Sequence, residues 1–504
     1  MNPSQAFRRD GALSPSASGA PRIAVLGAGI SGLVAAHELK KLGVPVTVFE
    51  RSGRVGGRIE TFQFPGTGHL GELGAMRIPG SHSNTLGYIA KLGLGGRLAR
   101  FTSLFRNTRG LIAVDDVPTP PRSCRPREPS GDATTDLVVR TVMYKLRAVI
   151  DAMSPGEIRD VFHKYLEGAM YSDLAALLGT QLEPARHWSL LNASIGALVS
   201  WFAKFEARLL PSLRIFLRDI DWEISEDLYL LKGGMQQLPE KLAEGLTQEL
   251  NLHCELKSIL SHADFVELVI HDRKRGLSWR EQFDYVLCTL PVPVLRGMTL
   301  KGFEARKLEA FRKTRYASAS KVLLLCRRKF WKQPPYGINS GASFVGGLTR
   351  QVYYSDLGLD AASRSPERGG TLLASYALGT ESEALAELPD DALVALVMKN
   401  LRRIHPEIDE PGMVEAFKVR HWQKEEGFLG GCSVTWPIYY AEEDREEDVT
   451  RLWEDVARPD QRVYFAGEHC SPERAWIEGA VSSSLRAVSA LVARGLQPRR
   501  ITGS

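Results

Sequence analysis

The sequence predicts an α/β and α+β protein in which the main α/β domain is discontinuous. Three observations support this fold class. The run from Arg22 to Glu50 has the pattern strand, glycine-rich turn, helix and strand, which is typical of a βαβ unit. Two further apolar strand segments, 284–291 and 462–468, lie far downstream and are expected to join the same sheet. The segments between them show helical or mixed patterns, so they should form separate units.

Composition is that of an ordinary soluble enzyme with two or three folding units. The chain has 504 residues, of which 44% are hydrophobic and 24% charged. Its net charge of +5 is spread along the sequence, which argues against a nucleic-acid groove. No apolar run of about 18 residues occurs, so we expect no membrane-spanning helix.

The ends of the chain and the cysteines predict a cytoplasmic protein without a metal site. Residues 1–20 are rich in Pro, Ser and Gly and lack an apolar signal segment, so we expect them to be disordered. The six cysteines lie far apart, with no CxxC spacing. This pattern favours reduced thiols in a cytoplasm and argues against zinc.

The glycine-rich turn predicts dinucleotide binding. It reads Gly27-Ala28-Gly29-Ile30-Ser31-Gly32 and leads directly into a helical pattern over 33–42. Gly27 permits the tight turn, Gly29 lets the backbone approach a pyrophosphate, and Gly32 lets helix and strand pack closely. The helix N-terminus offers N–H groups to the phosphates. Glu50, at the end of the next strand, can accept ribose hydroxyls and disfavours the 2′-phosphate of NADP.

The segment after this strand separates FAD from NAD. Arg51-Ser52-Gly53-Arg54-Val55-Gly56-Gly57-Arg58 places two glycines and an arginine near the same pyrophosphate. Together with the first turn, this pattern resembles the flavin amine oxidases. The resemblance implies FAD, with Arg58 neutralising phosphate charge. It also implies the flavin amine oxidase fold: a Rossmann-like FAD domain, a mixed-sheet substrate domain and a helical insert.

The far end of the chain carries further segments of the resemblance. The strand 462–466 is followed by Gly467 and Glu468, and Trp476 precedes a last helix. In the family, the Gly-Glu pair contacts the ribityl and phosphate region, and the N-terminus of the last helix points at the flavin. The resemblance implies cofactor contacts from Gly27, Gly29, Ile30, Ser31, Gly32, Glu50, Arg51, Gly57, Arg58, Gly74, Ala75, Met76, Arg77, Leu256, Trp422, Gly467, Glu468, Trp476, Ile477 and Ala480.

These segments predict the domain organisation. The FAD-binding domain should be assembled from 21–80, 230–295 and 455–495. Apolar residues recur at helical spacing within 136–229, which we expect to be a helical domain. The remaining segments, 81–135 and 296–454, should form the substrate-binding domain.

Arg77 indicates the class of substrate. It follows Gly74-Ala75-Met76, a segment of small residues that passes close to the flavin ring in the family. L-amino acid oxidases carry an arginine at this place, which binds the substrate carboxylate through two hydrogen bonds. Amine and polyamine oxidases generally lack it.

Four other residues are implied as substrate-binding or catalytic by the same resemblance. Lys321, in an apolar strand, resembles the lysine that acts on the flavin through a water. Tyr354 resembles a tyrosine that supports the carboxylate, with Tyr353 as the alternative because only one of the pair can face the site. Trp476 would form a wall beside the amine, and the Ala475 carbonyl would accept its hydrogen bond.

The predicted reaction is oxidative deamination of an L-amino acid by hydride transfer from Cα to FAD, which yields a 2-oxo acid, ammonia and hydrogen peroxide with molecular oxygen. Alternatives are a decarboxylating amino acid 2-monooxygenase, an amine or polyamine oxidase, and a non-catalytic FAD-bound interaction protein. Cys432 resembles the position of covalent flavin attachment in monoamine oxidases, but we expect an ordinary thiol. A homodimer is expected. The preferred substrate side chain stays open, since aromatic residues in these segments favour an apolar or aromatic side chain and acids within 219–227 favour a basic one.

Overall fold

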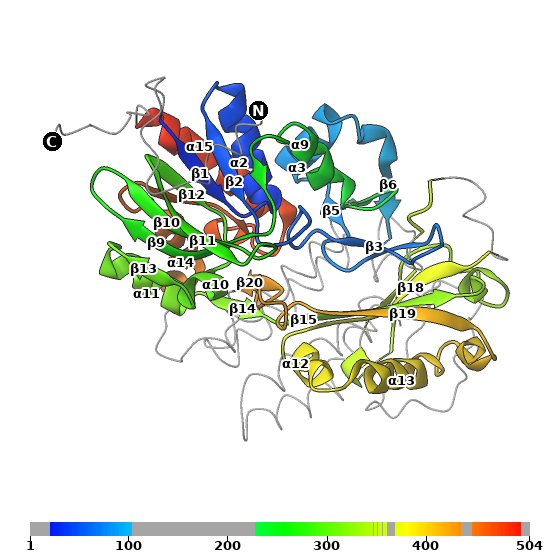
Figure 1. Ribbon diagram of the computed structural model, residues 1–504. Helices are drawn as coiled ribbons and strands as arrows, with labels where there is room; N and C mark the ends of the chain where they lie inside the picture. Colours follow the sequence, from blue (N-terminus) through cyan, green and yellow to red (C-terminus); the bar gives the residue numbers. More distant parts are fainter. Residues whose placement is uncertain are drawn as a thin grey trace, which may run out of the picture.

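The computed structural model describes residues 21–102, 227–345, 347–349, 351–354, 356–359, 368–434 and 446–494 (Figure 1). The terminus 1–20, predicted to be disordered, lies outside the described residues. Residues 103–135 of the predicted substrate-binding domain and 136–226 of the predicted helical domain also lie outside them, and so do most of the acids within 219–227.

A parallel sheet forms the nucleotide-binding part of the molecule. Its strand order is β21-β12-β1-β2-β8, and every neighbouring pair is parallel. The strands are β1 (Ile23–Leu26), β2 (Val46–Phe49), β8 (Leu250–Asn251), β12 (Tyr285–Cys288) and β21 (Val463–Phe465). β1 and β12 are buried throughout because both faces of a parallel sheet are covered. The prediction that segments 284–291 and 462–468 join the first strand is therefore confirmed.

Helices α2 (Ile30–Lys41) and α15 (Ile477–Ala493) pack side by side on one face of this sheet (Figure 1). Both helices bury small residues at their contact, where the hydroxyls of Ser31 and Ser484 lie 2.6 Å apart. α2 begins after Gly29 and stops before Gly43, which has a φ of 72° and so ends the helix as predicted. The first and last helices of the described chain therefore form one layer.

The other face is covered by an antiparallel layer and two helices. β9 (Cys254–Ser261), β10 (Val266–Asp272) and β11 (Leu277–Phe283) pair in order, and β13 (Thr299–Lys301) joins β9 in parallel. Their apolar residues share a core with β1, β12, α11 (Ala305–Lys313) and α14 (Glu446–Ala457). Shorter helices in this half are α3 (Ser83–Lys91), α9 (Gln237–Glu244) and α10 (Val292–Arg296).

A second unit is built on a five-stranded antiparallel sheet of order β16-β17-β18-β15-β19. The strands are β15 (Ala319–Cys326), β16 (Ala342–Phe344), β17 (Gln351–Tyr353), β18 (Gly370–Leu378) and β19 (Val414–His421). Helices α12 (Thr380–Ala386) and α13 (Asp390–Leu401) lie below the sheet in Figure 1. Val322 and Leu324 pack on the α13 side, whereas Leu323 and Leu325 pack on the opposite side with residues of β4 (Leu70–Glu72) nearby.

Small sheets join the two halves. They are β3 (Thr61–Gln63) with β4, β5 (Ile78–Pro79) with β7 (Leu228–Leu231) and β6 (Leu98–Phe101), and β14 (Arg315–Ala317) with β20 (Cys432–Val434). Packing places α3, α11 and α14 with the nucleotide-binding sheet, although the sequence boundaries assign α3, α11 and residues 446–454 of α14 to the substrate domain. Residues 228–229, assigned to the helical domain, begin strand β7. Within the described ranges, no helix is both long and apolar enough to cross a bilayer.

Candidate active site

The glycine turn after β1 leaves no room for side chains. Gly27 has a φ of 97°, a conformation that favours glycine. A Cβ on Gly32 would lie 1.9 Å from the Gly27 carbonyl oxygen, so α2 can approach the turn only without one. The Glu50 carboxylate is fixed by the Ala28 N–H at 2.9 Å and the Ser52 N–H at 2.8 Å. The acid thus sits at the mouth of the turn, where ribose hydroxyls are expected.

The twin-glycine loop, which carries Gly56 and Gly57, packs directly on this turn. Gly56 and Gly29 form a parallel bridge, and a Cβ on Gly57 would meet the Gly29 Cα at 3.2 Å. Both loops therefore present bare backbone to the same space. Bare backbone beside a helix N-terminus is the arrangement that a pyrophosphate requires, so these residues fit a dinucleotide.

Arg58 forms a partly buried ion pair with Glu468, which comes from the far end of the chain. Its Nη1 donates to Glu468 Oε1 at 2.8 Å and to the Gly431 carbonyl at 3.0 Å. The other Glu468 oxygen accepts from the Ser433 hydroxyl at 2.5 Å and from the Ala475 N–H at 3.1 Å. Burial alone would raise the pKa of Glu468, but the Arg58 charge and these hydrogen bonds lower it to about 2.

Arg77 lies between two aromatic rings. Its guanidinium carbon is 5.7 Å from the Trp476 ring centroid and 5.9 Å from that of Phe101. His82 meets Trp476 edge to face at 5.3 Å, which fixes the indole from behind. Trp476 caps α15, and Ala475 before it has a φ of 65°, a left-handed turn that carries the chain into the helix. The half-buried cation thus has an aromatic ring on each side.

Lys321 is buried on the side of β15 that faces the Gly74 segment. Its Nζ donates to the Gly74 carbonyl at 2.6 Å and to the Glu72 carbonyl at 3.3 Å, and it lies 4.8 Å from the Tyr376 ring centroid. Burial lowers the pKa of this ammonium to about 7, although the negative charge of Glu72 acts in the opposite direction. A buried lysine whose pKa is lowered in this way is common at functional sites.

Comparison with known proteins identifies the family. The model of the flavin containing amine oxidoreductases matches residues 30–492. The chain belongs to this family. As a flavin containing amine oxidoreductase with a dinucleotide cradle, it takes FAD as its cofactor.

Relatives and solved structures agree with this assignment. The oxidoreductase is 37% identical to the flavin-dependent L-tryptophan oxidase RebO of Lentzea aerocolonigenes, over 94% of this chain and 98% of that protein. It is 29% identical to an L-amino-acid oxidase of Mus musculus, over 92% and 70% of the two chains. Putrescine oxidase bound to putrescine superposes with a TM-score of 0.60 at 20% identity, covering 94% of this chain and 99% of that one, which shows the shared fold.

The structure places Tyr354 and Tyr353 in different surroundings. Its hydroxyl bonds to His405 at 2.6 Å and to Ser343 at 2.8 Å, inside the core beside α13. Tyr353 instead packs against Phe101, with 5.7 Å between ring centroids, on the side where Arg77 lies. The strand alternation thus turns Tyr353 toward the ring that Arg77 contacts and Tyr354 away from it, which favours Tyr353, the alternative of the pair, as the candidate.

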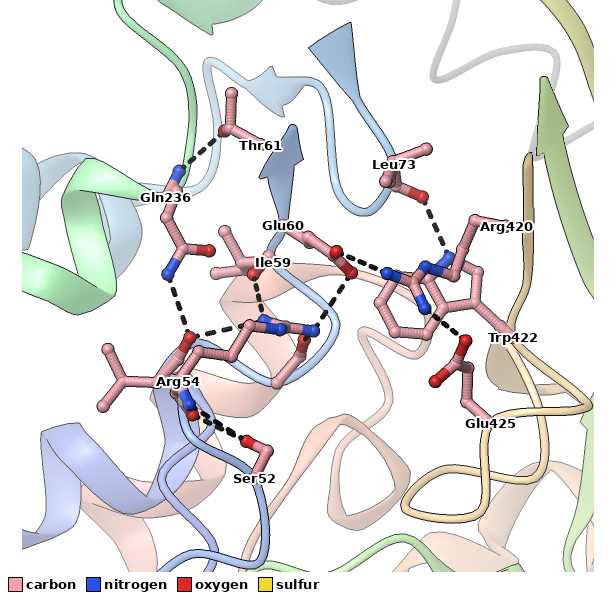
Figure 2. A network of polar contacts seen from close by, with 12 residues as sticks. Ser52, Arg54, Ile59, Glu60, Thr61, Leu73, Gln236, Arg420, Trp422 and Glu425 are labelled. Atoms are coloured by element: carbon pink, nitrogen blue, oxygen red, sulfur yellow. Dashed lines mark hydrogen bonds and ion pairs between the residues drawn. The ribbon is translucent and has the colours of Figure 1, made fainter. Parts of the chain in front are cut away.

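Other residues singled out in the sequence differ in their burial and in their contacts. Trp422 is buried, and its Nε1 donates to the Leu73 carbonyl at 2.9 Å (Figure 2). Arg51 pairs with Glu426 at 2.7 Å, and Leu256 lies in β9 with its side chain buried in the core of that layer. Cys432 lies half-buried in β20 opposite Ala317. The described residues contain no cluster of three side chains able to hold a metal ion.

Sequence reasoning missed Phe101 and Glu72. Phe101 ends β6 without any motif, and only the pairing of β6 with β7 brings it to Arg77. The Glu72 carboxylate is buried and accepts from the Met235 N–H at 2.7 Å and the Thr61 hydroxyl at 2.9 Å. Burial raises the pKa of Glu72. An acid inside the apolar strand pattern before Gly74 was the available signal for this residue.

Proposed function

We propose that the chain catalyses oxidative deamination of an L-amino acid with FAD, giving a 2-oxo acid, ammonia and hydrogen peroxide. The observation that carries this proposal is the half-buried guanidinium of Arg77 beside the Gly74 segment, between Trp476 and Phe101. A guanidinium in this position binds a carboxylate through two parallel hydrogen bonds, which a substrate without a carboxylate cannot accept. The names of the relatives support the same activity.

The residues divide the work of binding and proton control. Bound FAD supplies the acceptor for the Cα hydride and passes the electrons to molecular oxygen. Arg77 orients the carboxylate, Trp476 and Phe101 exclude water around it, and the Ala475 carbonyl accepts from the amine. Lys321 holds a proton at Nζ that it can release or accept near neutral pH, because burial has lowered the pKa of this group to about 7.

We further propose an aromatic L-amino acid as the substrate. Four rings lie in sequence from Trp476 past Arg77 to Phe101, Tyr353 and Tyr376. Tyr353 and Tyr376 have ring centroids 6.4 Å apart, so the apolar wall continues beyond the carboxylate site. Flat aromatic walls favour a planar side chain through edge and stacking contacts. The L-tryptophan oxidase among the relatives supports this preference.

The test is anaerobic bleaching of the flavin by L-tryptophan, D-tryptophan, tryptamine and a panel of other L-amino acids, followed by product identification. Only L-amino acids should bleach it, aromatic ones at the lowest concentration, and the product should be the 2-oxo acid. An amide product would instead indicate a 2-monooxygenase. Equal bleaching by tryptamine would indicate an amine oxidase, and no bleaching would indicate a non-catalytic flavoprotein.

Arg77→Met tests the carboxylate contact directly. Loss of a charge-assisted pair costs about 2–4 kcal/mol, so KM for the amino acid should rise about 30- to 1,000-fold. Arg100→Met is the matched control, because Arg100 lies on neighbouring strand β6 with 76% of its side chain exposed. The control should leave KM within about twofold. A normal KM in Arg77→Met would remove the basis of the proposal.

The finer properties are also proposals. We propose a cytoplasmic homodimer that holds FAD without a covalent bond. The cysteines are widely spaced along the sequence without a CxxC pattern, which supports a reducing compartment. Light scattering on the purified enzyme measures the mass of the particle, and acid precipitation should leave all yellow colour in the supernatant. Colour retained by the pellet, and lost in Cys432→Ala, would contradict non-covalent binding.

A further inference from the structure

We propose that Glu60 is a positioning residue whose carboxylate holds the twin-glycine loop and Trp422 in one assembly around the FAD site. Glu60 follows the Gly56-Gly57-Arg58 segment and sits between two arginines from different halves of the molecule (Figure 2). Only 12% of its side chain is exposed. The proposal goes beyond the reaction proposed above and needs only that FAD binds in the cradle.

The first arm of Glu60 reaches the twin-glycine loop. Its Oε2 accepts from Arg54 Nη2 at 3.1 Å. The same guanidinium donates to the carbonyls of Gly57 at 2.7 Å and of Val55 and Ile59, each at 3.3 Å. Arg54 therefore cross-links the backbone of the loop that packs on Gly29. Because these donors are used within the protein, Arg54 holds the loop and is not needed as a phosphate ligand.

The second arm reaches strand β19, which leads into the turn that carries Trp422. Glu60 Oε1 accepts from Arg420 Nη2 at 2.5 Å, and Arg420 lies in β19 of the second unit. The Arg420 guanidinium carbon lies 5.6 Å from the Trp422 ring centroid. Arg420 also pairs with Glu425, at the outer end of the network. The carboxylate of Glu60 thus connects a loop of the nucleotide-binding half to the indole environment of the other half.

The backbone of Glu60 completes the arrangement. Its carbonyl accepts from the N–H groups of Leu73 at 2.9 Å and Gly74 at 3.2 Å. The Leu73 carbonyl in turn accepts from Trp422 Nε1. Glu60 therefore contacts the twin-glycine loop and the Gly74 segment directly, and it is linked to the Trp422 turn through Arg420 and Leu73.

The negative charge of Glu60 is needed to hold Arg54 and Arg420 close to each other. Arg54 and Arg420 both point at it, and their side chains are only 33% and 18% exposed. Without the carboxylate, two partly buried cations would face each other in a medium that screens them weakly. The two cations would separate, and the twin-glycine loop and the end of β19 next to Trp422 would separate with them. Loss of Glu60 should therefore loosen the FAD site more than it weakens the fold.

Glu60→Gln tests this, with Glu425→Gln as the matched control because Glu425 contacts Arg420 but not Arg54. The readout is release of FAD from the holoenzyme, followed as the rise in flavin fluorescence after dilution, without substrate. Glu60→Gln should release FAD at least 10-fold faster, and Glu425→Gln within about twofold of the parent. The gap between the melting temperatures of holoenzyme and apoprotein should narrow in Glu60→Gln only.

Unchanged FAD release in Glu60→Gln, or equal losses of melting temperature with and without FAD, would overturn the proposal. If Glu60→Gln does not fold, Arg420→Gln keeps the test open, because it removes one arm and leaves Arg54 paired with Glu60. Arg420→Gln should accelerate FAD release, and a normal release rate would count against the proposal. Failure of the substrate proposal would leave these FAD measurements unaffected, so the two ideas fail separately.

Discussion

Replacement of Gly32 by alanine should weaken FAD binding, because the added Cβ would push α2 away from the glycine turn. A Cβ at this position would lie 1.9 Å from the Gly27 carbonyl oxygen and 3.1 Å from Thr289 Oγ1. Both Gly27 and Thr289 are fixed, since the Thr289 hydroxyl donates to the Leu26 carbonyl at 2.7 Å. Because carbon and oxygen need about 3.2 Å of separation, α2 or the turn must move by roughly 1 Å.

The size of the effect follows from this overlap. Forcing one extra carbon into a packed position costs about 1–3 kcal/mol. If the whole strain falls on the helix N-terminus that receives the pyrophosphate, FAD affinity should fall about 5- to 150-fold. Equilibrium titration of apoprotein with FAD, followed by quenching of flavin fluorescence, measures this loss directly.

Gly87→Ala is the control for Gly32→Ala. Gly87 lies in α3, and a Cβ there would meet no atom within 4 Å. FAD affinity should stay unchanged, and the helix should gain about 0.5–1 kcal/mol from the loss of a flexible residue. If Gly32→Ala bound FAD as tightly as Gly87→Ala, the close contact of α2 with the turn could not be what shapes the cradle.

Two further predictions concern the tyrosine pair and the buried acid. Tyr353→Leu should raise KM for an aromatic substrate about 5- to 10-fold, because the ring contacts are lost. Tyr354→Phe should leave KM unchanged and lower the free energy of unfolding by about 1–2 kcal/mol. Steady-state kinetics measure KM and urea unfolding measures stability; a raised KM in Tyr354→Phe with a normal KM in Tyr353→Leu would restore Tyr354 to the site. The folded-state pKa of Glu468 is lowered from 4.5 to about 2, so its stabilisation of roughly 3 kcal/mol is present above pH 4.5 and lost as pH falls toward 2. Glu468→Gln should flatten the decline in stability across that window, and an unchanged slope would show that the Arg58 pair does not control acid unfolding.

The sequence could predict the cradle because its residues lie close along the chain. The turn with Gly27 and Gly32 and the acid at Glu50 belong to one βαβ unit, whose geometry is set by local pattern. The partner of Arg58 was harder to foresee. Glu468 lies 410 positions away, and only the return of β21 to the sheet brings the two together.

The sequence could not predict which of Tyr353 and Tyr354 points toward the site. Alternation along a strand states that Tyr353 and Tyr354 point to opposite sides, but not which side holds the substrate. The register of β17 against β18 shifts between Gln351 and Tyr353, and such an irregularity has no sequence signature here. Phe101 lay beyond prediction for a related reason, since its place depends on pairing with a strand more than a hundred residues later.

The strand order of the parallel sheet has a consequence for synthesis of the chain. The β1 and β12 strands pair across about 260 residues, and β12 meets its second neighbour only when β21 emerges from the ribosome. Until then, the apolar edge of β12 and the face later covered by α15 are exposed in the nascent chain. Truncations that end before β21 should therefore aggregate, and chaperones should engage this enzyme late in translation.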